Sequence, residues 1–309
     1  MKAILFTLAL LLTANVCEAK IRLALNWKPE PQFGGFYAAE QNGEFKKRKL
    51  NVEIIPGGAG TPVIQMVGLG SVEYGVVSGD EVVIARSRGM KVVSLFATYQ
   101  THPQGVMAHA ERGFKSLKDV FISEGPLALQ MGLPYALLLK KKYPQAKSKI
   151  VPYLGGISNF LSDKKYSQQV FVTSEPLIAK QQKQDVSVFL VAEEGYNPYA
   201  TVLAVQEEAF KSKPKEVQAM VEAVRAGWKS YMKNPKPTNK FMAKLNKAMS
   251  PELFDESEKA QRPLIETAET KTSGLGTMTE ARWKQLVEQL LEVKIIPNSI
   301  PATELFRNL

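Results

Sequence analysis

The first part of the chain alternates between short apolar runs and stretches that are typical of helices. The alternation begins at residue 21 and continues to about residue 97. Strands that alternate with helices at this spacing indicate βαβ units and a mostly parallel sheet. The predicted strands are 21–27, 50–56, 72–78 and 91–98, and the predicted helices are 34–42, 61–69 and 80–88.

A second cycle of the same kind follows, and a helical tail then runs nearly to the end of the chain. Two such cycles predict two lobes with a ligand cleft between them, because ligands of open α/β sheets bind outside the carboxyl ends of the strands. In the tail, Trp228 and Trp283 fall on faces whose apolar residues recur three and four apart, so both are predicted to be core residues. The second-cycle strands are predicted at 105–110, 126–131, 149–154, 168–173 and 186–192, the helices near 133–142, 157–163 and 176–183, and the returning strand at 199–206.

Three helix starts carry capping signals. Thr61 precedes Pro62, and proline suits the first helical position because its missing N–H costs nothing there. Ser78 is predicted to cap the next helix, with acidic residues in its first turn. Thr277 and Glu280 have the spacing of a capping box.

The first 19 residues are typical of a cleaved secretory signal peptide. A lysine precedes an apolar run over 3–12, and small and polar residues follow, with cleavage predicted after Ala19. The apolar run is about half as long as the ~20 residues of a membrane-spanning helix. Lipidation at Cys17 is disfavoured, because Val16 occupies the position where lipoprotein peptidases require a small residue.

Charge and cysteine content narrow the class of protein further. The formal net charge of +10 favours anionic surfaces. The basic runs at 45–50 and 139–143, however, lie where helices should end, and the helix dipole favours cations there. We therefore expect no nucleic-acid binding. Cys17 is the only cysteine, so the mature chain forms no disulfide and depends on core burial.

The sequence contains no recognisable catalytic motif. His102 and His109 are the only histidines, and neither HExxH nor CxxC spacing occurs. A GxSxG nucleophile elbow, a GxGxxG loop and a phosphate-binding loop are also missing. A Ser-His-Asp triad has no local support, although its members need not be adjacent in sequence. We therefore predict a protein that is not an enzyme and that uses no cofactor and no metal.

Aromatic, amide, carboxylate and glycine residues gather in the loops that follow predicted strands. Stacking rings with a few aimed polar groups are the usual lining of a small-molecule site. Glycine-rich loops before helices offer N–H groups to a ligand, although ordinary tight turns are the alternative for them. The candidate ligand-binding residues are Asn26, Trp27, Phe33, Tyr37, Gly57, Gly58, Asp80, Gly155, Gly156, Glu175, Tyr196 and Asn197.

Several of these loops, taken in order, resemble one known family. The resemblance is to the ABC-transporter substrate-binding proteins related to thiamine-pyrimidine synthase, and it covers nearly the whole mature chain. The segments that carry it are LNWKPEPQFGGFYAAEQNGEF (25–45), GDEVVIARSRGMKVVSLFATYQTHPQGVMAH (79–109), VPYLGGISNFL (151–161), FVTSEP (171–176) and GYNPYATVL (195–203).

The resemblance implies a type II periplasmic-binding-protein fold. Two α/β lobes would enclose a ligand cleft and be joined by two crossover strands near 98–105 and 193–201. Lobe one would comprise residues 20–104 and 201–309, with a helical C-terminal tail, and lobe two would comprise residues 105–200.

The resemblance also implies roles for individual residues. Asn26 and Trp27 match a ligand-contacting position after the first strand, and Tyr37 matches an aromatic residue on the first helix. Glu175 matches a carboxylate that can pair with an aminopyrimidine edge, which presents hydrogen-bond donors. A carboxylate there favours a neutral or donor-bearing heterocycle, whereas a sulfonate or nitrate would require a cation. Packing of the helix start is the alternative role for Phe33.

The sequence therefore predicts the substrate-binding component of an ABC importer. We expect a periplasmic monomer that captures a small-molecule ligand, a thiamine-pyrimidine precursor or a similar vitamin-like heterocycle, and delivers it to an ABC permease and its ATPase. One alternative is a carrier of an anionic solute, either an alkylsulfonate or nitrate. The other is a pyrimidine-precursor synthase. The family's enzyme branch uses its own histidine and pyridoxal phosphate, and this chain departs from that branch in its secretion leader and in lacking a cysteine cluster for iron.

Overall fold

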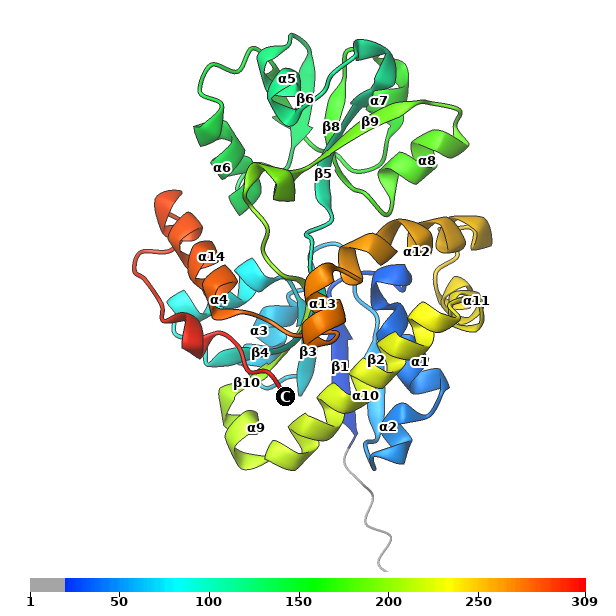
Figure 1. Cartoon of the computed structure of the whole chain (residues 1–309), viewed down its shortest axis with the longest axis vertical. Coiled ribbons are helices and arrows are strands. Elements are labelled where there is room, and N and C mark those ends of the chain that lie inside the picture. The colour runs from blue at the N-terminus through cyan, green and yellow to red at the C-terminus, as the bar shows by residue number, and fades with distance from the viewer. Residues whose placement is uncertain (1–19) are drawn as a thin grey trace, which may run out of the picture.

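The chain forms two lobes that are joined by two segments of backbone (Figure 1). The computed structural model describes residues 20–309, so the predicted signal peptide and Cys17 lie outside the described residues. Within the described part of the chain, no helix combines the length and the apolar character that crossing a bilayer requires.

Lobe one is built on a five-stranded sheet with the strand order β2-β1-β3-β10-β4. The first strand, β1, pairs in parallel with β2 and β3, whereas β10 lies antiparallel between β3 and β4. Strands β3, β10 and β4 are almost fully buried, which explains why they are continuous apolar runs. The strands are β1 (Ile21–Leu25), β2 (Val52–Ile55), β3 (Tyr74–Val77), β4 (Val92–Tyr99) and β10 (Ala200–Gln206).

Lobe two repeats this arrangement with the strand order β7-β6-β8-β5-β9. Here β6 pairs in parallel with β7 and β8, and β5 lies antiparallel between β8 and β9. The strands are β5 (Gln104–His109), β6 (Pro126–Leu129), β7 (Lys149–Pro152), β8 (Ser167–Phe171) and β9 (Val186–Leu190).

The chain enters lobe two between β4 and β5 and returns between β9 and β10. Lobe two is therefore inserted into lobe one, whose sheet takes its fourth strand from the returning chain. The two α/β lobes, the two connecting segments and the helical tail on lobe one confirm the predicted fold class.

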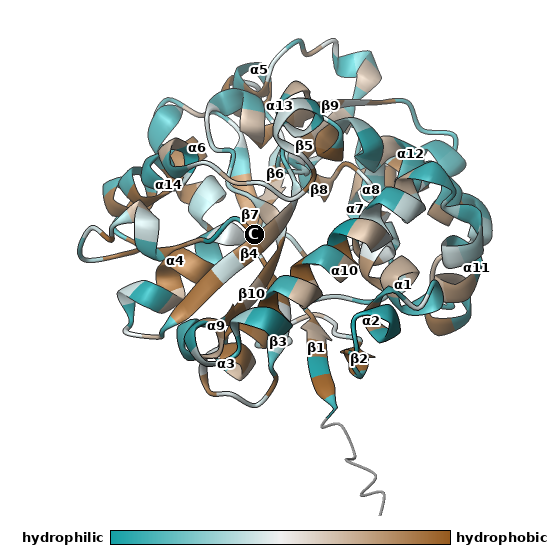
Figure 2. Ribbon diagram, turned by 60° about the horizontal axis from the view of Figure 1, so that its bottom comes forward, coloured by the Kyte–Doolittle hydropathy of each residue, from teal (hydrophilic) through white to brown (hydrophobic). Residues whose placement is uncertain are grey.

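Helices cover both sheets. Figure 2 shows β4 and β10 as mostly hydrophobic strands beneath helices that carry hydrophilic turns. In the first part of lobe one the helical segments are η1 (Pro31–Phe33), α1 (Gly34–Gln41), α2 (Glu44–Lys47), α3 (Val63–Gly68) and α4 (Gly79–Ser87). In lobe two they are η2 (Ala110–Arg112), α5 (Leu117–Ile122), α6 (Pro134–Lys142), α7 (Ser158–Ser162), α8 (Glu175–Gln181) and η3 (Val191–Glu194). In the tail they are α9 (Glu207–Ser212), α10 (Pro214–Lys233), α11 (Lys236–Leu245), α12 (Pro251–Ile265), α13 (Ala268–Ser273), α14 (Glu280–Glu292) and η4 (Ala302–Glu304).

The tail completes the core of lobe one through a close contact between α1 and α10. Gly35 lies against the ring of Trp228, so that a Cβ at position 35 would come within 2.2 Å of the indole. A Cβ at Gly227 would come within 2.1 Å of the Gly35 carbonyl oxygen. Both glycines are therefore required by the close approach of the two helices. Trp228 and Trp283 are both fully buried, which confirms their predicted core positions.

The capping predictions have mixed outcomes. Ser78 caps α4 in a capping box with Glu81, whose Oε2 accepts from the Ser78 N–H at 2.8 Å. Thr61 was expected to cap a helix, but α3 begins at Val63 and the Thr61 hydroxyl accepts the Gly58 N–H at 2.9 Å instead. The predicted box at Thr277 is wrong as well, since α14 is preceded by Thr279.

Candidate functional site

The lobe-one side of the candidate site follows directly after β1. Trp27 is 36% exposed, which is unusual for the largest apolar side chain, and its indole Nε1 donates to Glu30 Oε1 at 3.2 Å. Asn26 is half-buried beside it. Prolines flank Glu30 on both sides and fix the backbone of this short loop. An aromatic face and a carboxylate are thus held together at the carboxyl end of β1.

The lobe-two side is organised around Glu175, the first residue of α8. Its Oε1 accepts from the Tyr153 hydroxyl at 2.6 Å, and its Oε2 accepts from the Phe171 backbone N–H at 2.9 Å. Burial raises the pKa of Glu175, while these hydrogen bonds act in the opposite direction. Tyr153 follows β7 and Phe171 ends β8, so this carboxylate is fixed by groups at the ends of two strands that flank β6. We refer to Trp27, Glu30, Tyr153 and Glu175 as the interlobe group.

Helix α12 of lobe one connects the elements that carry the two sides of the interlobe group. Helix α12 of lobe one packs against α8 of lobe two, whose first residue is Glu175. Gln261 on α12 donates to the Pro31 carbonyl oxygen at 3.0 Å and accepts from the Tyr99 hydroxyl at 2.7 Å. Pro31 directly follows Glu30, so one buried glutamine links α12 to the loop after β1.

The negative charge of Glu175 acts on Glu30. The pKa of Glu30 is raised to about 7, mainly by burial and further by the negative charge of Glu175. The Trp27 hydrogen bond and the charge of Lys28 act in the opposite direction. The carboxylate of lobe two therefore opposes the ionisation of the one in lobe one.

Two predicted aromatic contacts lie in the core instead. Phe33 is 1% exposed and Tyr37 is 2% exposed, and both belong to the hydrophobic core of lobe one. The Tyr37 ring packs against Phe241 of α11 at 5.9 Å. The physical reason is that tail helices cover both segments: α12 packs on η1, which carries Phe33, and α10 and α11 pack on α1, which carries Tyr37. The structure therefore differs from the expectation that these two rings form a free wall.

Gly57 and Gly58 have a structural role that the sequence did not reveal. The Gly57 N–H donates to the Trp27 carbonyl oxygen at 3.1 Å, and the Gly58 N–H donates to Thr61 Oγ1 at 2.9 Å. A Cβ at Gly57 would come within 1.9 Å of the Leu25 carbonyl oxygen. Both N–H groups are therefore already used within the chain, which contradicts their expected role as ligand donors.

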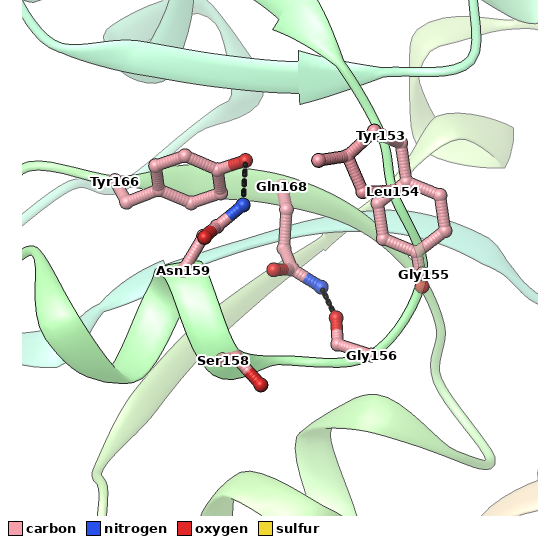
Figure 3. A pocket seen from close by; sticks show the side chains of 8 residues that line it. All are labelled: Tyr153, Leu154, Gly155, Gly156, Ser158, Asn159, Tyr166 and Gln168. Carbon is pink, nitrogen blue, oxygen red and sulfur yellow. Dashed lines mark hydrogen bonds between the residues drawn. The ribbon is translucent and has the colours of Figure 1, made fainter.

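Gly155 and Gly156 form an exposed left-handed turn, with φ angles of 83° and 67°. They border a cavity of about 150 Å³ in lobe two, which Figure 3 shows from close by. Gln168 on β8 reaches into this loop and donates to the Gly156 carbonyl oxygen at 2.9 Å. Tyr153 also lines the cavity, which therefore adjoins the Tyr153 side of the interlobe group.

Asp80 and Tyr196 are brought together, but by bonding to each other. The Tyr196 hydroxyl donates to Asp80 Oδ2 at 2.9 Å, and Tyr196 is 4% exposed. Asp80 stands in the first turn of α4, whereas Tyr196 lies on the segment that returns from lobe two. The pair therefore links lobe one to a connecting segment.

Asn197 lies in the hinge between the lobes. Its Oδ1 accepts from the His102 backbone N–H at 2.8 Å and from Arg282 Nη2 at 3.0 Å. Arg282 on α14 also donates to the carbonyl oxygens of Pro198 and Gln100, which belong to the two different connecting segments. Its guanidinium lies 3.9 Å from the centre of the Tyr199 ring. Asn197 therefore has a structural role at the hinge, and its expected ligand contact stays a prediction.

Glu30, Tyr153 and Arg282 were not among the site residues predicted from the sequence. Glu30 and Tyr153 stand inside loops that the pattern had already singled out, and an acidic residue between two prolines after a strand was a usable signal. Arg282 gave no local signal, because its partners lie 85 and 182 residues away in the chain. Within residues 20–309, no three His, Cys, Asp or Glu side chains gather in an arrangement suited to a metal ion.

The two α/β lobes and the carboxylates and aromatic rings at their strand ends define a chain of the periplasmic-binding-protein class. More particularly, the chain belongs to the NMT1/THI5-like family, whose profile matches residues 30–121 and 140–238. This confirms the family that the strand-end motifs predicted.

Individual relatives show how far the similarity extends. The chain is 23% identical over 287 residues to the formylaminopyrimidine-binding protein of Halalkalibacterium halodurans, which covers 90% of this chain and 87% of that protein. It is 27% identical over 103 residues to the 4-amino-5-hydroxymethyl-2-methylpyrimidine phosphate synthase of Legionella pneumophila, which covers 33% of each chain. In structure it matches the periplasmic aliphatic sulphonate-binding protein SsuA of Escherichia coli with a TM-score of 0.70 at 11% identity, covering 92% of this chain and 91% of that one. The structural match confirms the periplasmic-binding-protein fold.

Proposed function

We propose that this protein is the solute-binding component of an ABC importer. It captures a small aromatic heterocycle between its lobes in the periplasm and delivers it to a permease and its ATPase. The observation that carries the proposal is the pairing of an exposed Trp27 ring with fixed carboxylates on both sides of the lobe interface. A ring stacks on a heterocycle, and a carboxylate accepts hydrogen bonds from its amino groups.

The relatives support binding over catalysis. The match to the formylaminopyrimidine-binding protein runs through nearly the whole of both chains, whereas the match to the synthase covers a third of each. The cysteine cluster for iron, which the enzyme branch of the family uses, is also missing from the sequence. We therefore propose a carrier in which no covalent step takes place.

An anionic solute is the second candidate, since the fold is also that of a sulphonate-binding protein. The interlobe group argues against it, because Glu30 and Glu175 would repel a sulfonate or nitrate. The cation whose charge acts on Glu30 is Lys28, and it lies exposed at the surface.

A thermal-unfolding screen of the purified protein tests the proposal. The ligands are aminopyrimidines, thiamine, riboflavin, nitrate and an alkanesulfonate. A ligand that binds only the folded state adds about 2.7 kcal/mol of stability at a hundredfold excess over its Kd. We expect a heterocycle to give this shift, and Trp27→Ala and Glu175→Ala to abolish it.

Two variants provide matched controls. Leu69→Ala removes an exposed apolar side chain, and Glu288→Gln neutralises an exposed carboxylate on α14. Both should keep the ligand-induced shift. A shift with the sulfonate or nitrate alone would overturn the proposed ligand class and retain the fold.

A further inference from the structure

Neither carboxylate of the interlobe group has a cationic partner. The ion pairs within residues 20–309 include neither Glu30 nor Glu175. Both groups are largely removed from water, and both are acidic. Burying two like charges close together is unfavourable unless something compensates them.

The interface holds these two carboxylates in place from opposite sides. Glu30 is tied to lobe one through the Trp27 indole, and Gln261 fixes the adjoining Pro31. Glu175 is tied to lobe two through Tyr153 and the Phe171 N–H. Helix α8, which begins with Glu175, packs against α12, which holds the loop of Glu30 through Gln261.

Both carboxylates also keep unused hydrogen-bonding capacity. An ionised carboxylate has about four acceptor sites. Among the described residues, Glu30 accepts one side-chain hydrogen bond, from Trp27, and Glu175 accepts one from Tyr153 and one from a backbone N–H. The unused sites can only be filled by donors, and donors on a positively charged group fill them best.

We propose that Glu30 and Glu175 act together, one from each lobe, to select a heterocycle that carries a positive charge over a neutral one of the same shape. This inference rests on the proposed function and names the class of ligand that the same site takes. Trp27 stacks on the ring, Glu175 accepts from its amino edge, and Glu30 accepts from a cationic substituent. The elevated pKa of Glu30, about 7, agrees with a carboxylate that lacks its counter-charge until the ligand arrives.

Equilibrium binding measured by calorimetry with two matched probes tests the inference. One probe is a 4-amino-2-methylpyrimidine with a 5-aminomethyl group, which is an ammonium at neutral pH, and the other carries a neutral 5-hydroxymethyl group. We expect the protein to bind the aminomethyl probe about tenfold or more tightly, because a hydrogen bond to a charged group is worth roughly 1.5–3 kcal/mol.

Variants of Glu30 test whether this residue causes the preference for the charged probe over the neutral one. Glu30→Gln should bring the affinity ratio of the two probes close to one, with the hydroxymethyl affinity changed less than about threefold, because glutamine keeps an acceptor for the Trp27 indole and removes only the charge. Glu30→Asp keeps the charge and should retain most of the preference. Glu175→Gln should lower the affinity for both probes, and Glu288→Gln should leave both affinities unchanged.

The outcomes separate the inference from the proposed function. Equal affinities for the two probes in the unmodified protein, or a preference that survives Glu30→Gln, would overturn the inference alone. Failure of both probes to bind would overturn the proposed ligand class and the inference with it. A preference that is lost in Glu30→Gln and kept in Glu30→Asp would support both.

Discussion

Arg282 donates from Nε to the Asn197 carbonyl oxygen at 2.6 Å and from Nη2 to the Asn197 side-chain oxygen at 3.0 Å. The same guanidinium donates to Gln100 on the other connecting segment. One side chain of the tail therefore holds both connections between the lobes. Any relative movement of the lobes must take place around this point.

Replacement of Arg282 should weaken the whole fold. Hydrogen bonds from a charged donor are worth about 1.5–3 kcal/mol each, so we expect Arg282→Ala to lower the free energy of unfolding by roughly 3 kcal/mol. Arg282→Lys should recover only part of the loss, because a single ammonium cannot reproduce the planar fork. Urea denaturation measures the change. Lys284→Ala, an exposed neighbour on α14, should stay within about 0.5 kcal/mol of the unmodified protein. Equal stability of Arg282→Ala and Lys284→Ala would contradict the role given to Arg282.

The contact between Tyr196 and Asp80 should appear as an energetic coupling. In a double-mutant cycle of Tyr196→Phe and Asp80→Ala, the first change removes the donor and the second the acceptor of the hydrogen bond of 2.9 Å. Contacting residues show coupling energies of about 0.5–3 kcal/mol, and we expect roughly 1–2 kcal/mol here because the acceptor is charged. Thermal or chemical unfolding of the four proteins gives the value. Strictly additive losses would show that the pair does not join α4 to the returning segment.

Gly227→Ala should be strongly destabilising. Its Cβ would meet the Gly35 carbonyl oxygen at 2.1 Å and the Ala39 Cβ at 2.7 Å, and neither the backbone oxygen nor the helix that carries it can move freely. Overpacking of this kind costs about 3 kcal/mol or more where the neighbour is backbone. Lys229→Ala on the exposed side of α10 is the control. If both variants unfold at the same denaturant concentration, α1 and α10 are less closely packed than described.

Glu81 should make stability depend on pH near neutrality. Burial raises its pKa from 4.5 to about 7 despite the hydrogen bond from the Ser78 N–H. A carboxyl whose pKa is raised on folding stabilises fully below its unfolded pKa, and this contribution is lost as pH rises through the folded pKa. The free energy of unfolding should therefore fall between about pH 4.5 and 7, by at most ~1.4 kcal/mol per pH unit for this group.

Glu81→Gln isolates that contribution, because glutamine keeps an acceptor for the Ser78 N–H and does not titrate in this range. The stability of Glu81→Gln relative to the unmodified protein should increase from pH 5 to pH 8. Urea denaturation at several pH values measures the difference. A difference that is constant with pH would contradict the raised pKa.

The hydrophobic pattern was sufficient to predict the architecture. Strand β1 was expected at 21–27 and runs from Ile21 to Leu25, and the long tail helix begins at Pro214 as its apolar spacing indicates. These elements depend on local periodicity, which the sequence shows directly. The lobes follow from the order of the elements, since strand–helix alternation restricts the topology to a few choices.

The directions of individual side chains were harder to predict. Tyr37 and Trp27 both looked suited to stack on a ligand, but α1 is covered by helices that occur about two hundred residues later. Such long-range packing decides which face of α1 is buried, and local spacing does not contain it. Glu30 was overlooked for the opposite reason: it stands in a proline-rich loop, and only the structure brings Glu175 of the other lobe close to it.

Strand β10 lies between β3 and β4, yet it is the last strand to be synthesised. Until residue 200 is available, the sheet of lobe one consists of two unjoined pieces whose open edges invite non-native pairing. Lobe two, by contrast, is contiguous in sequence and contains all of its own strands. A chain that stops before β10 should therefore contain one folded lobe beside an incomplete one, and limited proteolysis would leave a single resistant fragment that spans β5 to β9. The order in which the polypeptide leaves the ribosome thus makes the inserted lobe the first to mature and the enclosing lobe the last.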